Sequence, residues 1–221
     1  VDMVAAYVEY LKENGTGDGP KIYFRMFKRM VTAAVDKDLI KKNPCRGFVL
    51  KNDNMTLQKE ILLPEEIQQL VATHFEGEKP EIHRAFIFGL YTGVRWCDTS
   101  QLTYRNVDYS TRTLRFQQQK TKDHSSRSWV IVPLNDTLIR LIGEPGNDNF
   151  DERIFKLPHY NICNLYLRKW VKEAGIRKKI TWHCARHSFA VNVLTKGANI
   201  KTVSSLLGHT SIKMTERYLH V

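Results

Sequence analysis

A single stretch of two-residue periodicity interrupts a chain that otherwise follows the spacing of α-helices. Leu114 and Phe116 alternate with polar residues, and Val130 and Val132 alternate with Trp129 and Ile131. Residues that alternate in this way lie on opposite faces of a β-strand. The polar segment 120–127 separates the two runs, so we expect a β-hairpin. The sequence therefore predicts a mainly α fold with a small antiparallel β-sheet (α+β).

The first 50 residues predict a small helical piece. Val4, Val8 and Leu11 recur at helical spacing, and a glycine-rich stretch follows them. A second helix is expected to end near Asn43, because the residue before a proline disfavours helical geometry. Its apolar face is predicted to hold Phe24, Phe27, Met30, Val31 and Ala34, and its polar face Arg25, Lys28 and Arg29.

The polar segment 51–54 is the best candidate for a linker. We expect a helical piece at 1–52 and a second domain at 53–221. In the second domain, Pro64 and the acidic residues after it are typical of a helix start. A further helix is expected at about 81–90, and helices follow residue 150, with Gly197 and Gly208 at helix ends.

Composition excludes several classes of protein. No apolar run approaches the roughly 20 residues that a membrane-spanning helix needs, and no secretory signal is visible. The four cysteines form no Cys-x-x-Cys pair, so we expect free thiols and a bacterial cytoplasmic protein.

Charge favours a polyanionic partner. The chain has a net charge of +11. Residues 151–221 contain 13 basic and 4 acidic residues, net +9, whereas residues 51–150 are close to neutral. A positive field concentrated in one segment suits nucleic acid, because neutralised phosphates release counterions.

Four short segments contain candidate functional residues, and each alone has an ordinary structural explanation. They are residues 92–95, 119–121, 183–187 and 207–209, the last followed nine positions later by Tyr218. His183 and His187 have the i, i+4 spacing of zinc ligands, but Cys184 stands where a metalloprotease needs glutamate. No third ligand is suggested nearby, so we expect no metal and no other cofactor.

In this order, the four segments resemble the tyrosine recombinase (phage integrase) family. The resemblance covers residues 58–221, and the residues before them resemble part of the family's core-binding (SAM-like) DNA-binding domain. It implies a tyrosine recombinase catalytic domain, with Asp98 in a supporting role. Lys122 is an alternative to Lys120 as the reactive lysine. The matched catalytic positions are Arg95, Lys120, His183, Arg186, His209 and Tyr218.

Phosphoryl chemistry explains why these residue types occur together. Displacement at a phosphodiester gathers negative charge on the non-bridging oxygens. Two guanidinium forks can neutralise that charge without metal ions, so we expect Arg95 and Arg186 to clamp the phosphate. The resemblance gives Tyr218 the role of nucleophile, His183 that of base, Lys120 that of acid, and His209 a bond to a phosphate oxygen.

The resemblance also implies the partners and the outcome of the reaction. It implies a 3′-phosphotyrosine intermediate and a homotetramer on double-stranded DNA with inverted-repeat core sites, and we lean towards integration or excision of a mobile element. Accessory DNA-bending or directionality proteins are possible partners, and a nucleoid location follows. DNA contacts are expected from Arg25, Lys28, Arg29, Lys122 and His187.

Two other functions stay open at this point. A type IB topoisomerase uses a similar site to nick and reseal one strand. Residues 200–207, the Gly208 turn and the helix after it could also form a non-catalytic helix-turn-helix DNA-binding module. That second alternative leaves the order of Arg95, Lys120 and Arg186 unexplained.

Overall fold

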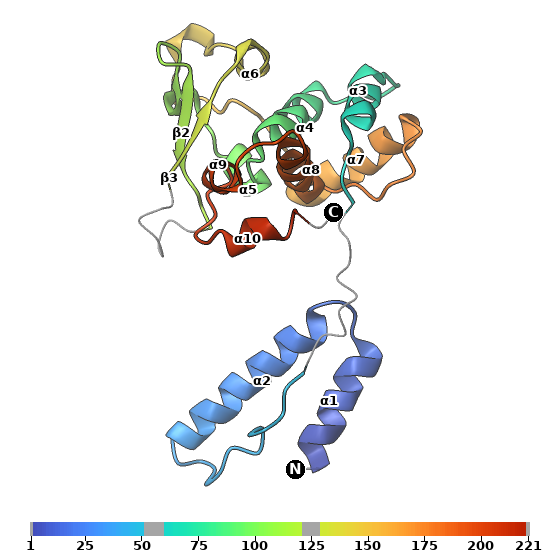
Figure 1. The fold of residues 1–221 in the computed structure, drawn as a ribbon, viewed down its shortest axis with the longest axis vertical. Helices are drawn as coiled ribbons and strands as arrows, with labels where there is room; N and C mark the ends of the chain where they lie inside the picture. Colours follow the sequence, from blue (N-terminus) through green and yellow to red (C-terminus); the bar gives the residue numbers. More distant parts are fainter. Residues whose placement is uncertain (1, 51–59, 121–128, 220–221) are drawn as a thin grey trace. The chain divides into compact units, whose positions relative to one another are not determined.

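The computed structural model describes residues 2–50, 60–120 and 129–219 of the chain. Backbone contacts divide the chain into two compact units, Val1–Gln58 and Lys59–Val221. The linker and the domain boundary expected at 51–54 lie outside the described residues, so that boundary stays a prediction. Figure 1 shows the helices and strands of both units, coloured along the sequence.

The first unit is a pair of helices with a small core. Helix α1 (Asp2–Asn14) packs against α2 (Gly19–Asp36), which begins with Pro20 in its first turn. Tyr7 meets Phe27 edge to face with ring centroids 5.0 Å apart. The buried apolar residues of this unit are Val4, Val8, Leu11, Phe24, Cys45 and Leu50.

Two expectations for the second helix were wrong. It ends at Asp36, well before the expected end near Asn43, and Asp38 adopts a left-handed backbone with φ 55°. Asp36, Lys37 and Asp38 alternate in charge, and the apolar Leu39 after them is 73% exposed, so this segment has no buried apolar face to hold another helical turn. Met30, which was expected on the buried face, is 70% exposed.

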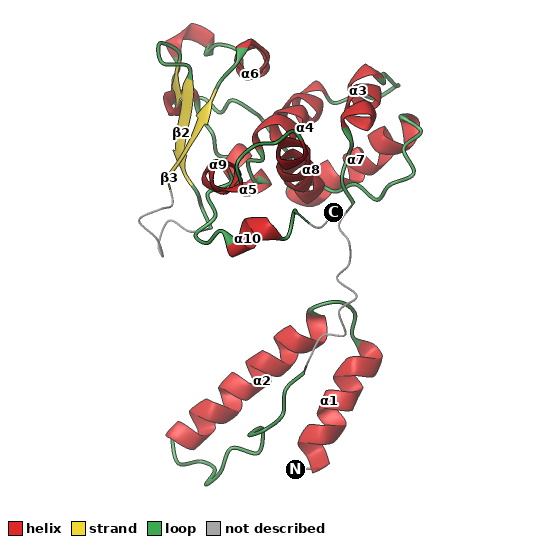
Figure 2. Ribbon diagram, in the orientation of Figure 1, coloured by secondary structure: helices red, strands yellow, loops and turns green. Residues whose placement is uncertain are grey.

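The second unit is mainly helical with one small sheet (Figure 2). Pro64 opens the first of its helices, as the sequence predicted, and Oε2 of Glu66 accepts a hydrogen bond from the backbone N–H of Leu63 at 2.8 Å. Its elements are α3 (Pro64–Ala72), α4 (Pro80–Thr92), α5 (Trp96–Thr99), η1 (Tyr104–Asn106), β1 (Val107–Asp108), β2 (Thr113–Gln117), β3 (Trp129–Pro133), α6 (Asp136–Ile142), η3 (Gly146–Asp148), α7 (Tyr160–Glu173), α8 (Trp182–Thr195), α9 (Ile200–Leu206) and α10 (Lys213–Glu216).

The strands form an antiparallel sheet in the order β1-β2-β3. Leu114 pairs with Val132 and Phe116 with Val130, and all four side chains are buried. Trp129 and Ile131 point the other way and are about half exposed. The predicted alternation is therefore confirmed, whereas the hairpin loop at 121–128 lies outside the described residues.

The core of the second unit surrounds α4 and α8, which pack side by side (Figure 1). Apolar residues bury both helices, and Trp182 meets Phe86 edge to face at 5.5 Å. Helix α9 lies between α8 and strand β3. The described residues contain no helix with both the length and the hydropathy to cross a membrane.

Candidate active site

Arg186 ties three parts of the second unit together. It lies on α8 and is 3% exposed. Its Nη1 donates to the carbonyl of Gly93 at 2.8 Å, and its Nη2 donates to the carbonyl of Leu207 at 2.6 Å. These carbonyls belong to the turns that precede Arg95 and His209. One buried guanidinium therefore brings two distant sequence segments to the same helix.

Both turns need glycine for two reasons. Gly93 and Gly208 have φ of +68° and +59°, a left-handed conformation that side chains disfavour. A Cβ at Gly93 would lie 2.6 Å from the Phe189 ring, and one at Gly208 would lie 2.5 Å from Nε2 of Gln118. Each turn can approach its neighbours this closely only because it has no side chain.

Tyr218 lies just after α10 and is 8% exposed. Its hydroxyl is 3.0 Å from Nδ1 of His187. Burial raises the pKa of the Tyr218 hydroxyl, and the positive charges of Arg186, Arg217 and Arg95 oppose that rise. The phenol is thus shielded from solvent yet surrounded by the charges that stabilise a phenolate.

His209 lies beside the same phenol. Its ring is nearly parallel to that of Tyr218, at 10° with centroids 6.3 Å apart. Its Nδ1 is 2.8 Å from Oγ1 of the buried Thr215. Burial, followed by the charges of Arg186 and Arg95, lowers the pKa of His209 to about 3. The imidazole is therefore neutral near pH 7 and is held by one nitrogen.

Arg95 and Asp98 form the other side of the site. Arg95 precedes α5, and its Nη1 is buried without a hydrogen-bond partner among the described residues. Asp98 is 2% exposed and accepts a hydrogen bond from the backbone N–H of Gln119 at 2.8 Å. Burial raises the pKa of the Asp98 carboxyl, against that hydrogen bond and the charges of Arg95 and Arg186. Arg95 therefore has a donor available to an incoming anion.

The β-hairpin reaches the site through Gln118. This side chain is 1% exposed, and its Nε2 donates at 2.9 Å to the Leu207 carbonyl that Arg186 also contacts. Lys120 follows two residues later and is exposed. The alternative lysine, Lys122, lies outside the described residues. Gln118 thus joins the end of β2 to the turn before His209, and Lys120 lies two residues beyond it in the sequence.

The two histidines of α8 differ in their surroundings. His183 lies in the first turn and is exposed, whereas His187 is 5% exposed and contacts Tyr218. Their rings meet edge to face with centroids 4.6 Å apart. His187, predicted to contact DNA, is therefore a buried neighbour of the phenol in this structure.

The other predicted DNA contacts belong to the first unit. Arg25, Lys28 and Arg29 line an open hollow of about 560 Å³ on α2 together with Phe24 and Phe48. Nζ of Lys28 donates to the Phe48 carbonyl at 3.1 Å, while Arg25 and Arg29 are exposed. Basic side chains and an apolar floor share this surface.

Sequence reasoning missed three contributors, Gln118, Thr215 and Arg217. Arg217 adjoins Tyr218 in the sequence and acts on the pKa of both Tyr218 and His209. Its position next to the nucleophile was a usable signal. Nothing in the sequence marked Gln118 or Thr215, because their roles depend on contacts with Leu207 and His209 across the fold.

The described residues contain no group of three or more histidine, cysteine, aspartate or glutamate side chains that could hold a metal ion. None of the four cysteines forms a disulfide, including Cys97, which precedes Asp98 in the sequence.

A helical domain with one small sheet, in which a buried tyrosine lies among arginines from separate segments, has the architecture of a tyrosine recombinase catalytic domain. The model of the phage integrase family matches residues 60–221. The chain belongs to this family.

Known relatives agree with this assignment. A tyrosine recombinase of Pseudothermotoga lettingae is 28% identical over 81% of this chain and 62% of its own length. XerD of Oceanobacillus iheyensis is 32% identical over 73% of this chain and 58% of its own. The chain thus spans about three fifths of the length of such relatives.

Solved structures share the fold. The Tn1549 transposon integrase bound to transposon right end DNA matches with a TM-score of 0.74, at 22% identity over 96% of this chain and 78% of the other. The catalytic domain of the bacteriophage HP1 integrase matches with a TM-score of 0.57, at 26% identity over 74% of this chain and 88% of the other.

Proposed function

We propose that the chain is the catalytic part of a site-specific DNA recombinase that cuts and rejoins strands through a 3′-phosphotyrosine. The observation that carries this proposal is the convergence of Arg186, Arg95 and His209 around the buried Tyr218. Permanently charged guanidiniums can stabilise both the phenolate and the phosphate charge that grows during displacement.

The reaction begins when a DNA phosphate enters between the two arginines. Arg95 offers its unpartnered Nη1, and Arg186 offers the hydrogens that its two carbonyl contacts leave unused. Nδ1 of His209 lies 2.8 Å from the Thr215 hydroxyl. In the proposed tautomer this hydroxyl donates to Nδ1, and Nε2–H donates to a non-bridging oxygen. The site is thus prepared for one tetrahedral anion.

Tyr218 then attacks the phosphorus, and the 5′ oxygen leaves. Its proton departs through the histidines of α8, with His183 as the base that the family resemblance implies. Lys120 donates a proton to the leaving oxygen. Because the phosphotyrosine ester retains the energy of the cut bond, a 5′ hydroxyl of another strand can attack it and complete the exchange.

The same proposal covers the partners. Duplex DNA with inverted-repeat core sites binds a tetramer, and the outcome is integration or excision of a mobile element in the bacterial nucleoid, with accessory DNA-bending or directionality proteins. The net charge of +9 in residues 151–221 supports DNA as the partner. Arg25, Lys28 and Arg29 of the first unit add backbone contacts, and Lys122 extends the lysines of the hairpin.

The test is to trap the covalent complex. The chain is incubated in EDTA with a library of nicked duplexes of random core sequence, in which the short cut fragment diffuses away and prevents religation. We expect an adduct that survives denaturing electrophoresis, maps to Tyr218 by mass spectrometry, and enriches one core sequence.

Each other outcome contradicts part of the proposal. DNA binding without an adduct would favour the helix-turn-helix alternative, and an adduct on another residue would remove Tyr218. Relaxation of supercoiled plasmid without enrichment of any sequence would favour the topoisomerase alternative. An adduct that forms when a divalent metal ion is added, but does not form in EDTA, would overturn metal independence.

A further inference from the structure

Among the described residues, one imidazole is in direct contact with the hydroxyl of Tyr218. Nδ1 of His187 lies 3.0 Å from the Tyr218 oxygen, and the two rings are 5.3 Å apart. Both side chains are more than nine-tenths buried. A nitrogen at this distance can accept the phenol proton without a bridging water.

Ring contacts join His183 to His187, and His187 to the phenol. His183 occupies the preceding turn of α8, is exposed, and meets the ring of His187 edge to face at 4.6 Å. The three rings therefore follow one another in the order His183, His187, Tyr218. A proton that leaves Tyr218 reaches His187 first.

Within the described part of the chain, the other polar neighbours of the phenol are poor acceptors. Arginine has no acceptor atom, which excludes Arg186, Arg95 and Arg217. His209 lies parallel to the phenol, and its Nδ1 is engaged by Thr215. Water has little access, because Tyr218 is 8% exposed.

We propose that His187 is a catalytic residue that accepts the Tyr218 proton directly. The proposal rests on the recombinase function given above. As the bond from Tyr218 Oη to phosphorus forms, the Oη proton moves to Nδ1 of His187. The bond from phosphorus to the 5′ oxygen breaks, and that oxygen takes a proton from Lys120. On rejoining, His187 returns its proton to Tyr218.

The first experiment removes the proton acceptor, His187, and then makes the phenol of Tyr218 more acidic. His187→Asn is compared with the wild type and with His159→Asn, a control at the exposed N-cap of α7. The rate of adduct formation is measured on the duplex selected from the nicked library. We expect His187→Asn to lose roughly 10²- to 10⁴-fold in rate, the usual contribution of a general base.

A more acidic phenol should restore part of that rate. When 3,5-difluorotyrosine replaces Tyr218, its proton leaves more easily, so the His187→Asn variant should recover at least about tenfold. A loss caused by altered packing would not respond to phenol acidity. The same replacement in a Lys120→Met background should give no recovery, because the deficit there lies at the leaving oxygen.

The outcomes separate the two proposals. No adduct with the wild type would overturn the recombinase function. An active wild type with His187→Asn within about threefold of its rate, or with no recovery from difluorotyrosine, would overturn the role of His187 alone. A loss confined to His183→Gln would return the base role to His183.

A second measurement does not depend on the folding of the His187 variant. In the wild type and in Tyr218→Phe, the ¹⁵N resonances of His187 are compared in the absence of DNA. We expect the Nδ1 resonance to move when the hydroxyl is removed, while that of His159 stays in place. An unchanged Nδ1 resonance would overturn the contact.

Discussion

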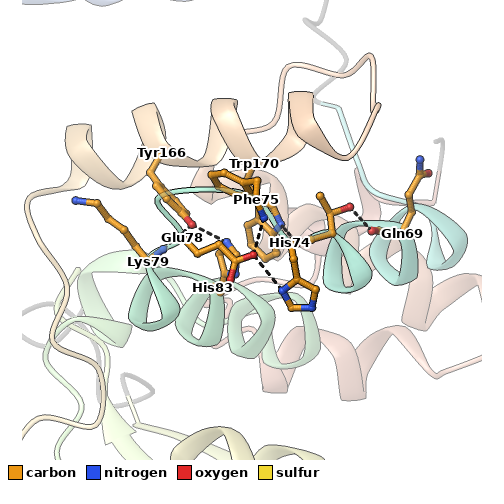
Figure 3. A network of polar contacts seen from close by, with 9 residues as sticks. Gln69, His74, Phe75, Glu78, Lys79, His83, Tyr166 and Trp170 are labelled. Carbon is orange, nitrogen blue, oxygen red and sulfur yellow. Dashed lines mark hydrogen bonds and ion pairs between the residues drawn. The ribbon is translucent and has the colours of Figure 1, made fainter.

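The described residues of the second unit include two hydrogen-bonded pairs of histidine and tyrosine, with very different neighbours. At the start of α4, the Tyr166 hydroxyl contacts Nε2 of His83 at 2.7 Å and accepts from the Lys79 backbone N–H at 2.7 Å (Figure 3). Past the other end of α4, beyond Gly93, the Tyr218 hydroxyl contacts His187. Residue types and contact lengths are similar in the two pairs.

Their electrostatic surroundings separate them. Burial raises the pKa of both hydroxyls, but the charge of Glu78 raises that of Tyr166 further, whereas three arginines lower that of Tyr218. His83 is also stacked on Trp170 at 3.6 Å (Figure 3). The first pair is therefore a structural contact, and the second is prepared to lose a proton. Charge, rather than contact, distinguishes them.

The largest expected effect comes from removing each hydroxyl in turn. Tyr218→Phe should bind the selected duplex normally and form no covalent adduct, because the nucleophile is gone. Tyr166→Phe should form adducts at nearly the wild-type rate, at a cost of about 1 kcal/mol in stability from its lost hydrogen bonds. Denaturing gels measure adduct formation, and thermal melts measure the change in stability. An adduct in Tyr218→Phe would mean that another nucleophile acts.

The next effect compares two arginines that both donate to carbonyls, the buried Arg186 and the half-buried Arg84. Arg186→Lys should slow adduct formation by roughly 10²- to 10³-fold, because an ammonium lacks the planar fork. Arg84 donates to the carbonyls of Ile142 and Ile154 and pairs with Glu81. Arg84→Lys should destabilise the fold by about 1–3 kcal/mol and retain the reaction rate. Equal rates of adduct formation in Arg186→Lys and Arg84→Lys would contradict the distinction between the two arginines.

A smaller effect is expected where the hairpin meets the site. Gln118→Met keeps the side-chain volume and removes the donor to Leu207, so Lys120 should lose its register and adduct formation should fall about tenfold. The exposed Gln117→Met is the matched control. In a duplex with sulfur as the bridging 5′ atom, the leaving group needs no proton from Lys120. This duplex should therefore restore the rate of the Gln118→Met variant. Failure to restore it would mean that Gln118 acts through Arg186.

The smallest effect concerns how the stability of the fold depends on pH through His83, the partner of Tyr166. Burial lowers the pKa of His83 below its usual 6.5, so the folded state binds fewer protons than the unfolded state. Its contribution to stability is complete above about pH 6.5 and is lost as the pH falls. His83→Phe should lower the Tm by a few degrees at pH 7.5 and flatten its decline between pH 7 and 5. A slope identical to that of the wild type would contradict this sign.

Any decline of the Tm with falling pH that persists in His83→Phe comes from other groups with lowered pKa values. His209, with a pKa of about 3, has the same sign. Adduct formation at pH 7.5 should be unchanged in His83→Phe, because His83 lies near the start of α4, whereas Arg186 contacts Gly93 just past its end.

Local patterns were readable from the sequence wherever neighbours along the chain decide the structure. Pro64 marked a helix start, Gly197 and Gly208 marked helix ends, and the alternation around Leu114 marked a buried strand face. The end of α2 was misjudged, since the helix ends at Asp36 and Asp38 is left-handed, well before Pro44 could interrupt it.

The sequence by itself determined the family, because the order and spacing of the segments around Arg95, Arg186 and Tyr218 are properties of the chain. Only the tertiary structure decided which imidazole contacts the phenol. His183 and His187 lie on the same helix four residues apart, so their spacing does not rank them. Burial beside Tyr218 and the shared Leu207 carbonyl arise from packing between distant segments, and packing sets both the contact and the local charge.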